Sequence, residues 1–339
     1  MRMHTFPGQV VAVFTPSPCA SERARARETG QCNAGHPRRG PLLACAVAVT
    51  MLVNCTSSHR SSISTTRPEN DTTQLRTIRP QLILFDASGD ESWDLYAVSI
   101  DGSGLVRLTD EPAPDFDGTC SPDGTRIAYR SERDGNPEIY VMNADGSGEL
   151  DLTNDPATDY SPSWSPDGTQ LAFASDRAGG TANDIYVMNG DGTDVRRVTD
   201  SPAIEEYPTW SPDGNRIAFA NESTGEIWIV YVDGSGLRNL SSPVGDGTRD
   251  DGPAWSPDGT HIAFSSGPEH GRKDVYVMDV DGSHRTRLTA SGGASPSWSP
   301  DGERIAYSWG SIYLMNRDGS ATVRMAVEDL GELNFPDWC

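Results

Sequence analysis

The tetrapeptide Ser-Pro-Asp-Gly occurs five times in this chain, beginning at residues 121, 165, 211, 256 and 299. The steps between successive copies are 44, 46, 45 and 43 residues, so the period is almost constant. A period of that length is typical of one supersecondary unit that is copied around or along an axis. In such folds the repeated strands form a scaffold and the loops form the binding surface, so we expect recognition rather than chemistry.

Each copy contains four short runs rich in β-branched and aromatic residues, which predict four β-strands. In one copy these runs are Pro253–Trp255, Ile262–Phe264, Val275–Met278 and Arg287–Thr289. Ser-Pro-Asp-Gly separates the first two runs, and an Asp-Gly pair separates the last two. Both phrases suit tight hairpins, because Asp and Gly accept positive φ at low cost.

Six such Asp-Gly pairs occur, at residues 101, 145, 191, 233, 281 and 318, but there are only five Ser-Pro-Asp-Gly phrases. The runs Leu82–Phe85, Leu95–Val98 and Val106–Thr109 supply the second, third and fourth strands of a sixth copy. Its first strand matches Phe335–Trp338, at the other end of the chain. We therefore expect a closed ring in which the carboxyl-terminal strand completes the first sheet and removes the exposed sheet edges.

These motifs, recurring at fixed phase over residues 80–339, resemble the TolB-type β-propeller repeat. The resemblance implies an all-β fold, a six-bladed β-propeller of four-stranded blades, closed by pairing of the carboxyl-terminal strand with the first blade. TolB is a periplasmic protein of the cell envelope with an amino-terminal α/β domain before its propeller, and residues 1–79 do not resemble that domain. Similar repeats also form the non-catalytic propeller of prolyl-oligopeptidase-like peptidases, whose separate hydrolase domain we do not expect in residues 1–339.

The amino-terminal segment has the layout of an export signal. Arg38 and Arg39 precede an apolar run from Pro41 to Val53, and Cys55 follows in a sequence that resembles a bacterial lipoprotein cleavage box. We expect residues 1–55 to be an export or lipoprotein-type leader with lipidation at Cys55. A plain signal peptide and an uncleaved signal anchor are the alternatives. Residues 56–79, rich in Ser and Thr, are expected to be a flexible tether before the propeller at 80–339.

The predicted propeller is strongly acidic, with 45 acidic and 18 basic residues between positions 78 and 339. Such a surface repels phosphate backbones, so nucleic acid is an unfavourable partner, whereas a basic protein segment or a cation is attracted. Solubility alone also accounts for this acidity. We expect a monomer, since ring closure leaves no open sheet edge.

The sequence contains none of the usual catalytic constellations: no Gly-x-Ser-x-Gly elbow, no phosphate-binding Gly-x-x-x-x-Gly-Lys, and no His pair at metal-ligand spacing. Aspartates around the Asp-Gly turns echo a calcium loop only faintly, and hairpin chemistry explains them. We therefore assign no catalytic residue. An enzyme alternative stays open, in which a metal-assisted lyase or hydrolase acts on a saccharide in the channel.

Four acidic residues occupy the same place in the repeat, three residues before the usual Pro of the first strand. The set is Asp115, Asp159, Glu205 and Asp250. Because the first strand of each propeller blade lines the channel, we expect these carboxylates near one channel mouth. They are candidates for a Ca²⁺ site or for docking of a basic segment. The alternative is that they cap turns.

Two cysteines lie in the predicted propeller. Cys120 replaces the repeated Trp in the first strand of one blade, and Cys339 follows Trp338 in the first strand of the preceding blade. A disulfide between them would close the ring in an oxidising compartment, and two free buried thiols are the alternative. Together these features favour an exported, membrane-tethered scaffold of the cell envelope that binds a protein or peptide. A purely structural envelope scaffold is a further alternative.

Overall fold

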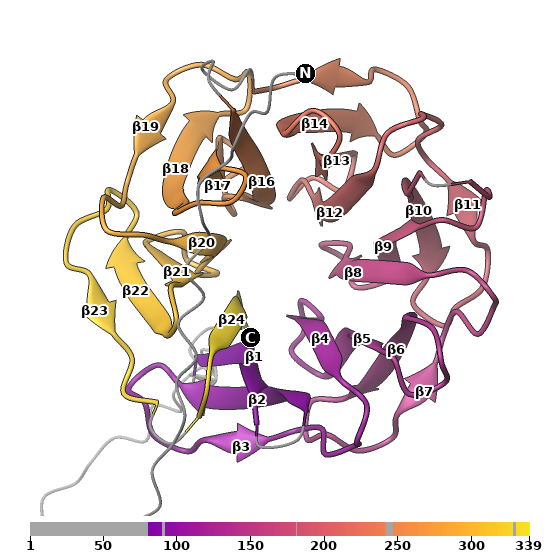
Figure 1. The fold of residues 1–339 in the computed structure, drawn as a ribbon, viewed down its shortest axis with the longest axis horizontal. Helices are drawn as coiled ribbons and strands as arrows, with labels where there is room; N and C mark the ends of the chain where they lie inside the picture. The colour runs from indigo at the N-terminus through magenta and orange to yellow at the C-terminus, as the bar shows by residue number, and fades with distance from the viewer. Residues whose placement is uncertain (1–80, 90–91, 181, 242–246, 328–329) are drawn as a thin grey trace, which may run out of the picture. The chain divides into compact units, whose positions relative to one another are not determined.

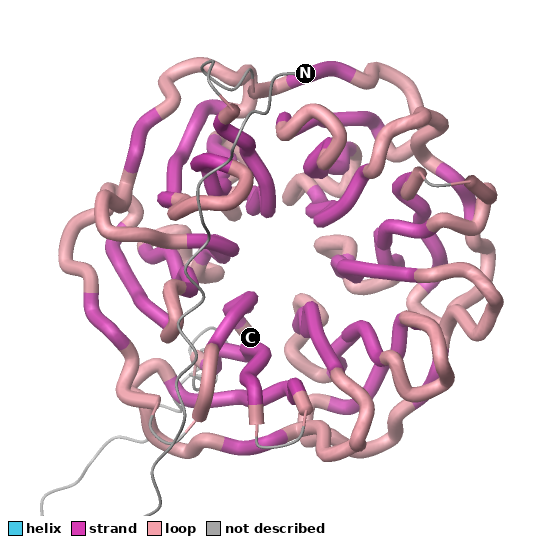
Figure 2. Tube along the Cα trace, in the orientation of Figure 1, coloured by secondary structure: helices cyan, strands magenta, loops and turns pink. Residues whose placement is uncertain are grey.

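The computed structural model describes residues 81–339, except 90–91, 181, 242–246 and 328–329. These residues form six four-stranded antiparallel sheets arranged as blades around one axis (Figure 1). The predicted six-bladed propeller is thereby confirmed. The tube in Figure 2 shows strands and connecting loops throughout the ring. No helix long and apolar enough to cross a bilayer occurs among the described residues.

We number the blades 1 to 6 in chain order of their second strands. The innermost strands of blades 1 to 6 are β24 (Leu333–Trp338), β4 (Asp115–Cys120), β8 (Asp159–Trp164), β12 (Glu205–Trp210), β16 (Thr248–Trp255) and β20 (Ala294–Trp298). The second strands are β1 (Leu82–Ser88), β5 (Arg126–Ser131), β9 (Gln170–Ser175), β13 (Arg216–Asn221), β17 (His261–Pro268) and β21 (Arg304–Ser308).

The third strands are β2 (Trp93–Ser99), β6 (Glu138–Asn143), β10 (Asp184–Asn189), β14 (Glu226–Tyr231), β18 (Asp274–Asp279) and β22 (Ile312–Asn316). The outermost strands are β3 (Val106–Arg107), β7 (Leu150–Asp151), β11 (Arg196–Arg197), β15 (Arg238–Asn239), β19 (Thr286–Arg287) and β23 (Val323–Arg324). Each outermost strand has only two residues, which leaves little unpaired edge to recruit another chain.

The Ser-Pro-Asp-Gly phrase builds the hairpin between the first and second strands through its side chains. In blade 2 the Ser121 hydroxyl donates to Asp123 Oδ1 at 2.7 Å, and the same oxygen accepts from the Thr125 amide at 3.0 Å. Gly124 completes the turn with φ of 64°. These hydrogen bonds lower the pKa of Asp123 to about 2, so its carboxylate is ionised at neutral pH.

The glycine of the second, Asp-Gly hairpin is required by its neighbour as well as by its backbone. Gly282 has φ of 90°, and a Cβ there would lie 2.3 Å from the carbonyl oxygen of Leu240 in the preceding blade. Gly192 stands in the same relation to the carbonyl of Leu152, at 2.8 Å. The hairpin tips therefore pack directly against the outer strand of the blade before, which fixes the spacing between blades.

The core lies between successive blades. The aromatic residue that ends each Ile-Ala-aromatic run is almost wholly buried, as at Phe173 and Phe264 with no exposed surface. The repeated tryptophans pack between blades, as expected: Trp164 belongs to one cluster with Ile139 and Val141 of the preceding blade. Burial of such large apolar side chains is the main driving force for docking each blade on the next.

The two ends of the propeller meet in blade 1. Ile83 pairs with Trp338 and Leu84 pairs with Asp337 in the antiparallel register of β1 and β24. The Trp338 indole donates to the Ser297 carbonyl of blade 6 at 3.1 Å. The carboxyl terminus therefore closes the ring, as the sequence predicts.

A disulfide joins Cys120 of blade 2 to Cys339 of blade 1, with the two Cα atoms 5.4 Å apart. Its sequence separation is 219 residues, so the bond ties together nearly the whole propeller. A crosslink that closes a long loop lowers the entropy of the unfolded chain more than one that closes a short loop.

We predict that Cys339→Ser lowers the free energy of unfolding by about 2–4 kcal/mol, because the long loop is no longer closed. Denaturant unfolding with and without a reductant measures the effect. A reductant should destabilise the unchanged chain to a similar extent and leave a Cys120→Ser/Cys339→Ser double variant unaffected. Equal stability of the single variant and the unchanged chain would contradict this role for the disulfide.

Candidate functional site in the central channel

Every innermost strand breaks its pairing with the second strand at the same place. In β4 the register shifts between Phe116 and Thr119, and in β12 it shifts between Glu206 and Thr209. Such β-bulges redirect side chains and are frequent beside functional sites. The bulge residue in front of the Pro (Gly118 in blade 2) has positive φ in all six blades, between 47° and 55°.

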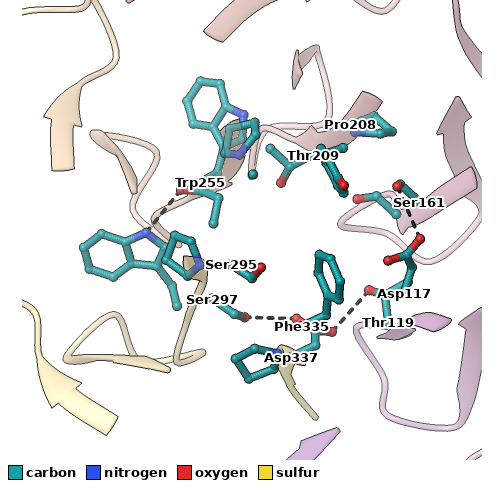
Figure 3. A pocket seen from close by; sticks show the side chains of 18 of the residues that line it. Asp117, Thr119, Ser161, Pro208, Thr209, Trp255, Ser295, Ser297, Phe335 and Asp337 are labelled. Atoms are coloured by element: carbon teal, nitrogen blue, oxygen red, sulfur yellow. Dashed lines mark hydrogen bonds between the residues drawn. The ribbon is translucent and has the colours of Figure 1, made fainter. Parts of the chain in front are cut away.

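The side chains at this left-handed position differ from blade to blade. From blade 1 to blade 6 they are Phe335, Asp117, Ser161, Tyr207, Gly252 and Ser295. Five of the six are not glycine, although this conformation strains any residue with a Cβ. All six line a cavity of about 290 Å³ in the channel (Figure 3). The repeated backbone thus presents five kinds of residue from six blades to one central space.

A second tier of channel residues comes from the middle position of the Pro-x-Trp phrase. Its members are Thr119, Ser163, Thr209, Ala254, Ser297 and Asp337. Asp337 is the one carboxylate among them. Its Oδ2 accepts from the Thr119 hydroxyl at 3.2 Å and from the Cys120 amide at 3.0 Å, and its Oδ1 accepts from the Ser297 hydroxyl at 3.0 Å. Burial raises the pKa of Asp337 above its ordinary value.

Two aromatic rings meet within the channel. Tyr207 of blade 4 and Phe335 of blade 1 stack with their centroids 6.1 Å apart and their planes at 19°. Blades 1 and 4 are opposite each other in the propeller, so the two aromatic side chains come from facing walls of the channel. Figure 3 labels Phe335. Burial raises the pKa of the Tyr207 hydroxyl, so it is neutral at physiological pH. The cavity therefore has an apolar surface beside its polar one.

The other channel carboxylate, Asp117, belongs to a pair of acids with the buried Asp86. The amide of Asp117 donates to Oδ2 of Asp86 at 3.0 Å, whereas Oδ1 of Asp86 has no hydrogen-bond partner among the described residues. Asp86 has no exposed surface. Burial first, and then the charge of Asp117, raise the pKa of Asp86 well above its ordinary value. Burial also raises the pKa of Asp117.

One arginine faces this pair. Arg130 Nη1 lies 3.9 Å from Asp117 Oδ2, and the guanidinium stacks over the ring of Phe116 at 4.3 Å. The Ser161 hydroxyl donates to the same Asp117 oxygen at 3.4 Å. Of the two acids only Asp117 lines the cavity, and its carboxyl oxygens favour a cationic or hydrogen-bond-donating ligand on this side of the channel.

The four acids that the sequence singled out begin or nearly begin the innermost strands and are all buried, but none lines the cavity. Arg133 contacts Asp115 at 3.3 Å, and Arg285 contacts Asp250 at 2.5 Å. Burial raises the pKa of Asp115, and the Ser131 hydroxyl and Arg133 oppose that shift. The binding role that we expected for these acids stays a prediction.

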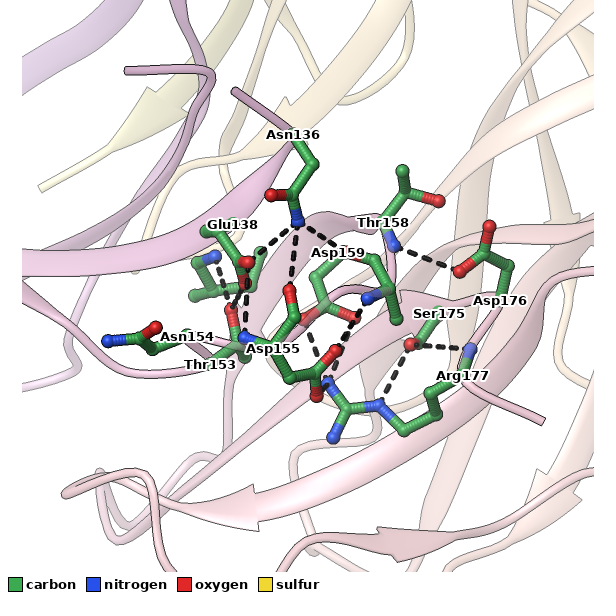
Figure 4. A network of polar contacts seen from close by, with 12 residues as sticks. Asn136, Glu138, Thr153, Asn154, Asp155, Thr158, Asp159, Ser175, Asp176 and Arg177 are labelled. Atoms are coloured by element: carbon green, nitrogen blue, oxygen red, sulfur yellow. Dashed lines mark hydrogen bonds and ion pairs between the residues drawn. The ribbon is translucent and has the colours of Figure 1, made fainter. Parts of the chain in front are cut away.

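Asp159 shows how such an acid is used locally (Figure 4). Its Oδ2 lies 2.8 Å from Arg177 Nη2, and that nitrogen is also 3.3 Å from Asp155. Arg177 Nε donates in turn to the Ser175 hydroxyl at 2.9 Å. The arginine therefore ties the start of β8 to the loop before it and to the end of β9.

Glu205, the fourth acid, has no arginine within ion-pair distance among the residues that the structure describes. The Ser201 hydroxyl donates to its Oε1 at 2.6 Å, and its buried Oε2 lacks a partner. Burial raises its pKa. Among the described residues, no three His, Cys, Asp or Glu side chains lie together as candidate metal ligands. The predicted lipidation site Cys55 and the leader and tether lie outside the residues that the structure describes.

Sequence reasoning missed the channel residues Asp117, Tyr207 and Phe335, and the buried Asp86 beside them. The usable signal was the residue before Pro in each Pro-x-Trp phrase, since its identity changes while its neighbours repeat. Two of the arginine partners could also have been found from the sequence. Asp115 and Arg133 are separated by 18 residues, and so is the equivalent pair in the next blade.

We predict that Asp86→Asn stabilises the protein at pH 7 by about 1–3 kcal/mol, because it removes a desolvated charge with an unpaired oxygen. A raised folded-state pKa means that the native protein gains stability from protonation of Asp86. That gain is present below about pH 4 and is lost as pH rises through the folded-state pKa. The stabilisation by Asp86→Asn should therefore grow with pH in denaturant titrations and vanish near pH 3.

Asp101→Asn serves as the control of opposite sign. Hydrogen bonds from Ser103 lower the pKa of Asp101, so its ionised form stabilises the exposed turn above the unfolded-state pKa. Asp101→Asn should lower stability at neutral pH and lose its effect in acid. If Asp86→Asn were instead less stable than the unchanged chain at pH 7, the ionised carboxylate of Asp86 would be stabilising. Our inference that its burial destabilises the native protein would then be wrong.

Comparison with known proteins places this geometry in a family. The model of the TolB beta propeller domain matches residues 121–266 and 246–338. No curated protein sequence matches the chain. TolB from Acinetobacter baumannii is 24% identical with a TM-score of 0.67, over 76% of this chain and 66% of that one, less than two thirds of its length.

The putative TolB from Agrobacterium tumefaciens is 23% identical with a TM-score of 0.60, over 75% of this chain and 91% of that one. An oligogalacturonate lyase in complex with manganese is 17% identical with a TM-score of 0.54, over 73% of this chain and 74% of that one. At these identities the structural likenesses show the fold alone. The family match covers more than half of the sequence, and the chain therefore belongs to the TolB β-propeller family.

Proposed function

We propose that this protein is a non-enzymatic, exported propeller of the cell envelope that binds a protein or peptide partner through its central channel. The observation that carries the proposal is the tier of six left-handed bulge residues. Their side chains converge on one cavity of about 290 Å³ and differ in every blade except the two that carry serine. A scaffold that repeats its backbone and varies its channel side chains is organised for recognition.

The chemistry of the channel favours a partner segment with a basic or donor-rich part and an apolar part. Asp117 and Asp337 offer carboxylate oxygens, and the stacked rings of Tyr207 and Phe335 offer an apolar face. The acidic balance of residues 78–339 adds long-range attraction for a basic segment. A protein or peptide partner agrees with the TolB family membership.

Two features support export to the cell envelope. The disulfide between Cys120 and Cys339 is of a kind that persists in oxidising compartments and is rare in the bacterial cytosol. The sequence before the propeller resembles a lipoprotein leader, with Cys55 as the lipidated residue and residues 56–79 as the tether. In this proposal the membrane holds the protein near its partner.

The enzyme alternative draws on the fold of oligogalacturonate lyase, which is shared at 17% identity. A metal-assisted reaction on a saccharide needs a cluster of metal ligands facing the channel, and the described residues contain no such group. Ca²⁺ as a ligand of the acidic residues also has no specific contact in its favour. We therefore place binding first.

We predict that filling the channel abolishes capture of the partner. Ser295→Tyr is suited to the test, because Tyr207 shows that the equivalent backbone accepts a tyrosine at φ of 55°. The full-length chain and the Ser295→Tyr variant would be used for affinity capture from the native membrane, with quantitative mass spectrometry. Proteins that bind through the channel should be depleted at least about tenfold with the variant, which corresponds to a loss of about 1.4 kcal/mol.

Leu150→Tyr is the matched control, since Leu150 lies on the outer strand β7 and is 56% exposed. It adds an aromatic ring of the same size far from the channel and should leave capture unchanged. Equal recovery of every captured protein by the unchanged chain and by Ser295→Tyr would contradict the proposal that the channel is the binding site.

A further inference from the structure

Arginine side chains cover the repeated tryptophans on the face formed by the Ser-Pro-Asp-Gly turns. Arg126 lies over Trp164 at 4.4 Å from the ring centroid, and Arg216 lies over Trp255 at 5.0 Å. In each case the arginine is the first residue of the second strand in the preceding blade. A guanidinium stacked on an indole is a favourable cation–π contact.

The same cover recurs at the boundary of blades 6 and 1, where Arg304, the first residue of β21, lies over Trp338 at 5.1 Å. At the boundary of blades 5 and 6 the equivalent residue is His261, and Trp298 is covered instead by Arg317 of its own blade, at 5.9 Å. At the boundary of blades 3 and 4 the place of the arginine is taken by Gln170, the first residue of β9. Among the described residues, no arginine or lysine lies over the ring of Trp210.

A pocket of about 260 Å³ occupies this boundary, and we call it the Trp210 pocket. It is lined by Ser165, Pro166, Asp167, Gln170, Trp210, Pro212, Asp213 and Gly214. Hydrogen bonds from neighbouring hydroxyl and amide groups lower the pKa of both Asp167 and Asp213, so both carboxylates are ionised at neutral pH. The pocket thus joins an indole to two carboxylates, of which Asp213 also lies 3.9 Å from Arg216 Nη2.

The boundary of blades 2 and 3, where Arg126 covers Trp164, shows which contacts a guanidinium makes at this position. Arg126 donates to the carbonyl of Gly190 at 3.0 Å and to that of Gly168 at 3.3 Å, besides stacking on Trp164. The equivalent carbonyls in blade 4 belong to Val232 and Gly214. Arg196 donates to the Val232 carbonyl at 2.6 Å, whereas Gly214 lines the Trp210 pocket.

We propose that the Trp210 pocket binds the guanidinium group of an arginine side chain presented by a protein partner. The incoming guanidinium stacks on the Trp210 indole as Arg126 stacks on Trp164, with the Gly214 carbonyl as its acceptor and with Asp167 and Asp213 as its counter-charges. Pro166 and Pro212 belong to the same repeated turns as Pro257, which lines the channel cavity. The pocket and that end of the channel therefore lie on one face.

This inference deepens the proposed function by naming one side chain of the partner, and its test does not involve the channel. The probe is the acetylated and amidated peptide Gly-Arg-Gly, titrated into the full-length chain labelled with ¹⁵N at its eight indoles. A Trp210→Phe variant assigns the Trp210 signal. That signal should shift saturably, and peptides with lysine or citrulline in place of arginine should bind at least about fivefold more weakly.

Gln170→Arg is the decisive variant, because it supplies the missing cover from within the chain. It should abolish the shift of the Trp210 signal by the peptide, and it should raise Tm by about 1–3 °C through the added cation–π contact. Val323→Arg is the matched control for charge. Val323 is 62% exposed on β23, and the equivalent outer-strand positions in two other blades already carry Arg196 and Arg238.

The proposal is overturned if the Trp210 signal fails to saturate, if the lysine peptide matches the arginine peptide, or if Gln170→Arg with an unchanged or higher Tm still responds. A response lost in Val323→Arg as well would assign the effect to net charge and would also overturn it. Capture of the partner by the channel can succeed or fail independently of all these results.

Discussion

The constraint on which the structure depends is closure of the ring inside a single blade. Blade 1 takes three strands from the beginning of the propeller and its innermost strand, β24, from the end. Without β24, β1 would be left without its inner partner and Trp338 would leave the core between blades 6 and 1. Closure also supplies Phe335 and Asp337 to the channel and Cys339 to the disulfide. The last five residues therefore serve stability and the candidate site together.

The β-bulge in each innermost strand separates the residues that support the fold from the residue that lines the candidate site. In four blades a buried acid, held by arginine or hydroxyl groups, lies before the bulge, and in four blades the strand ends after the bulge in the Trp and the Ser-Pro-Asp-Gly turn. Between them stands a residue with positive φ whose side chain reaches the cavity. Strain of this kind persists only where the surrounding structure fixes it, and the two paired strands do so here. The site can therefore vary at these positions without loss of the fold.

Much of the fold could be predicted because the same strand and turn motifs occur in every copy of the repeat. The period gave the blades, the hairpin phrases gave the strands, and the match of Phe335–Trp338 to the other Pro-x-Trp phrases gave the closure. The pairing of Cys120 with Cys339 was one of two options, since alternation along a strand does not say which face meets a neighbour. The secondary structure of residues that repeat in phase could be predicted from the local sequence, because every copy shows the same pattern.

The candidate site was harder to predict because its residues are the ones that do not repeat. Tyr207 and Phe335 come from opposite blades, and nothing in either local sequence says that the rings stack. The pairing of Asp86 with Asp117 likewise depends on how blades 1 and 2 dock. Acids such as Asp115 were visible in sequence, but their burial and their arginine partners, which lie in loops next to the strands, were not. Burial and partnership are tertiary properties that spacing alone does not reveal.

The central claim is that the six bulge segments form the docking site of a protein partner. Amide hydrogen exchange of the full-length chain, alone and with the captured partner bound, tests this most directly. We expect slower exchange in the innermost strands around Asp117, Tyr207 and Phe335, with the outermost strands unchanged, since binding protects the backbone that it covers. Protection confined to outermost strands such as β7 and β11, with the innermost strands unaffected, would contradict it.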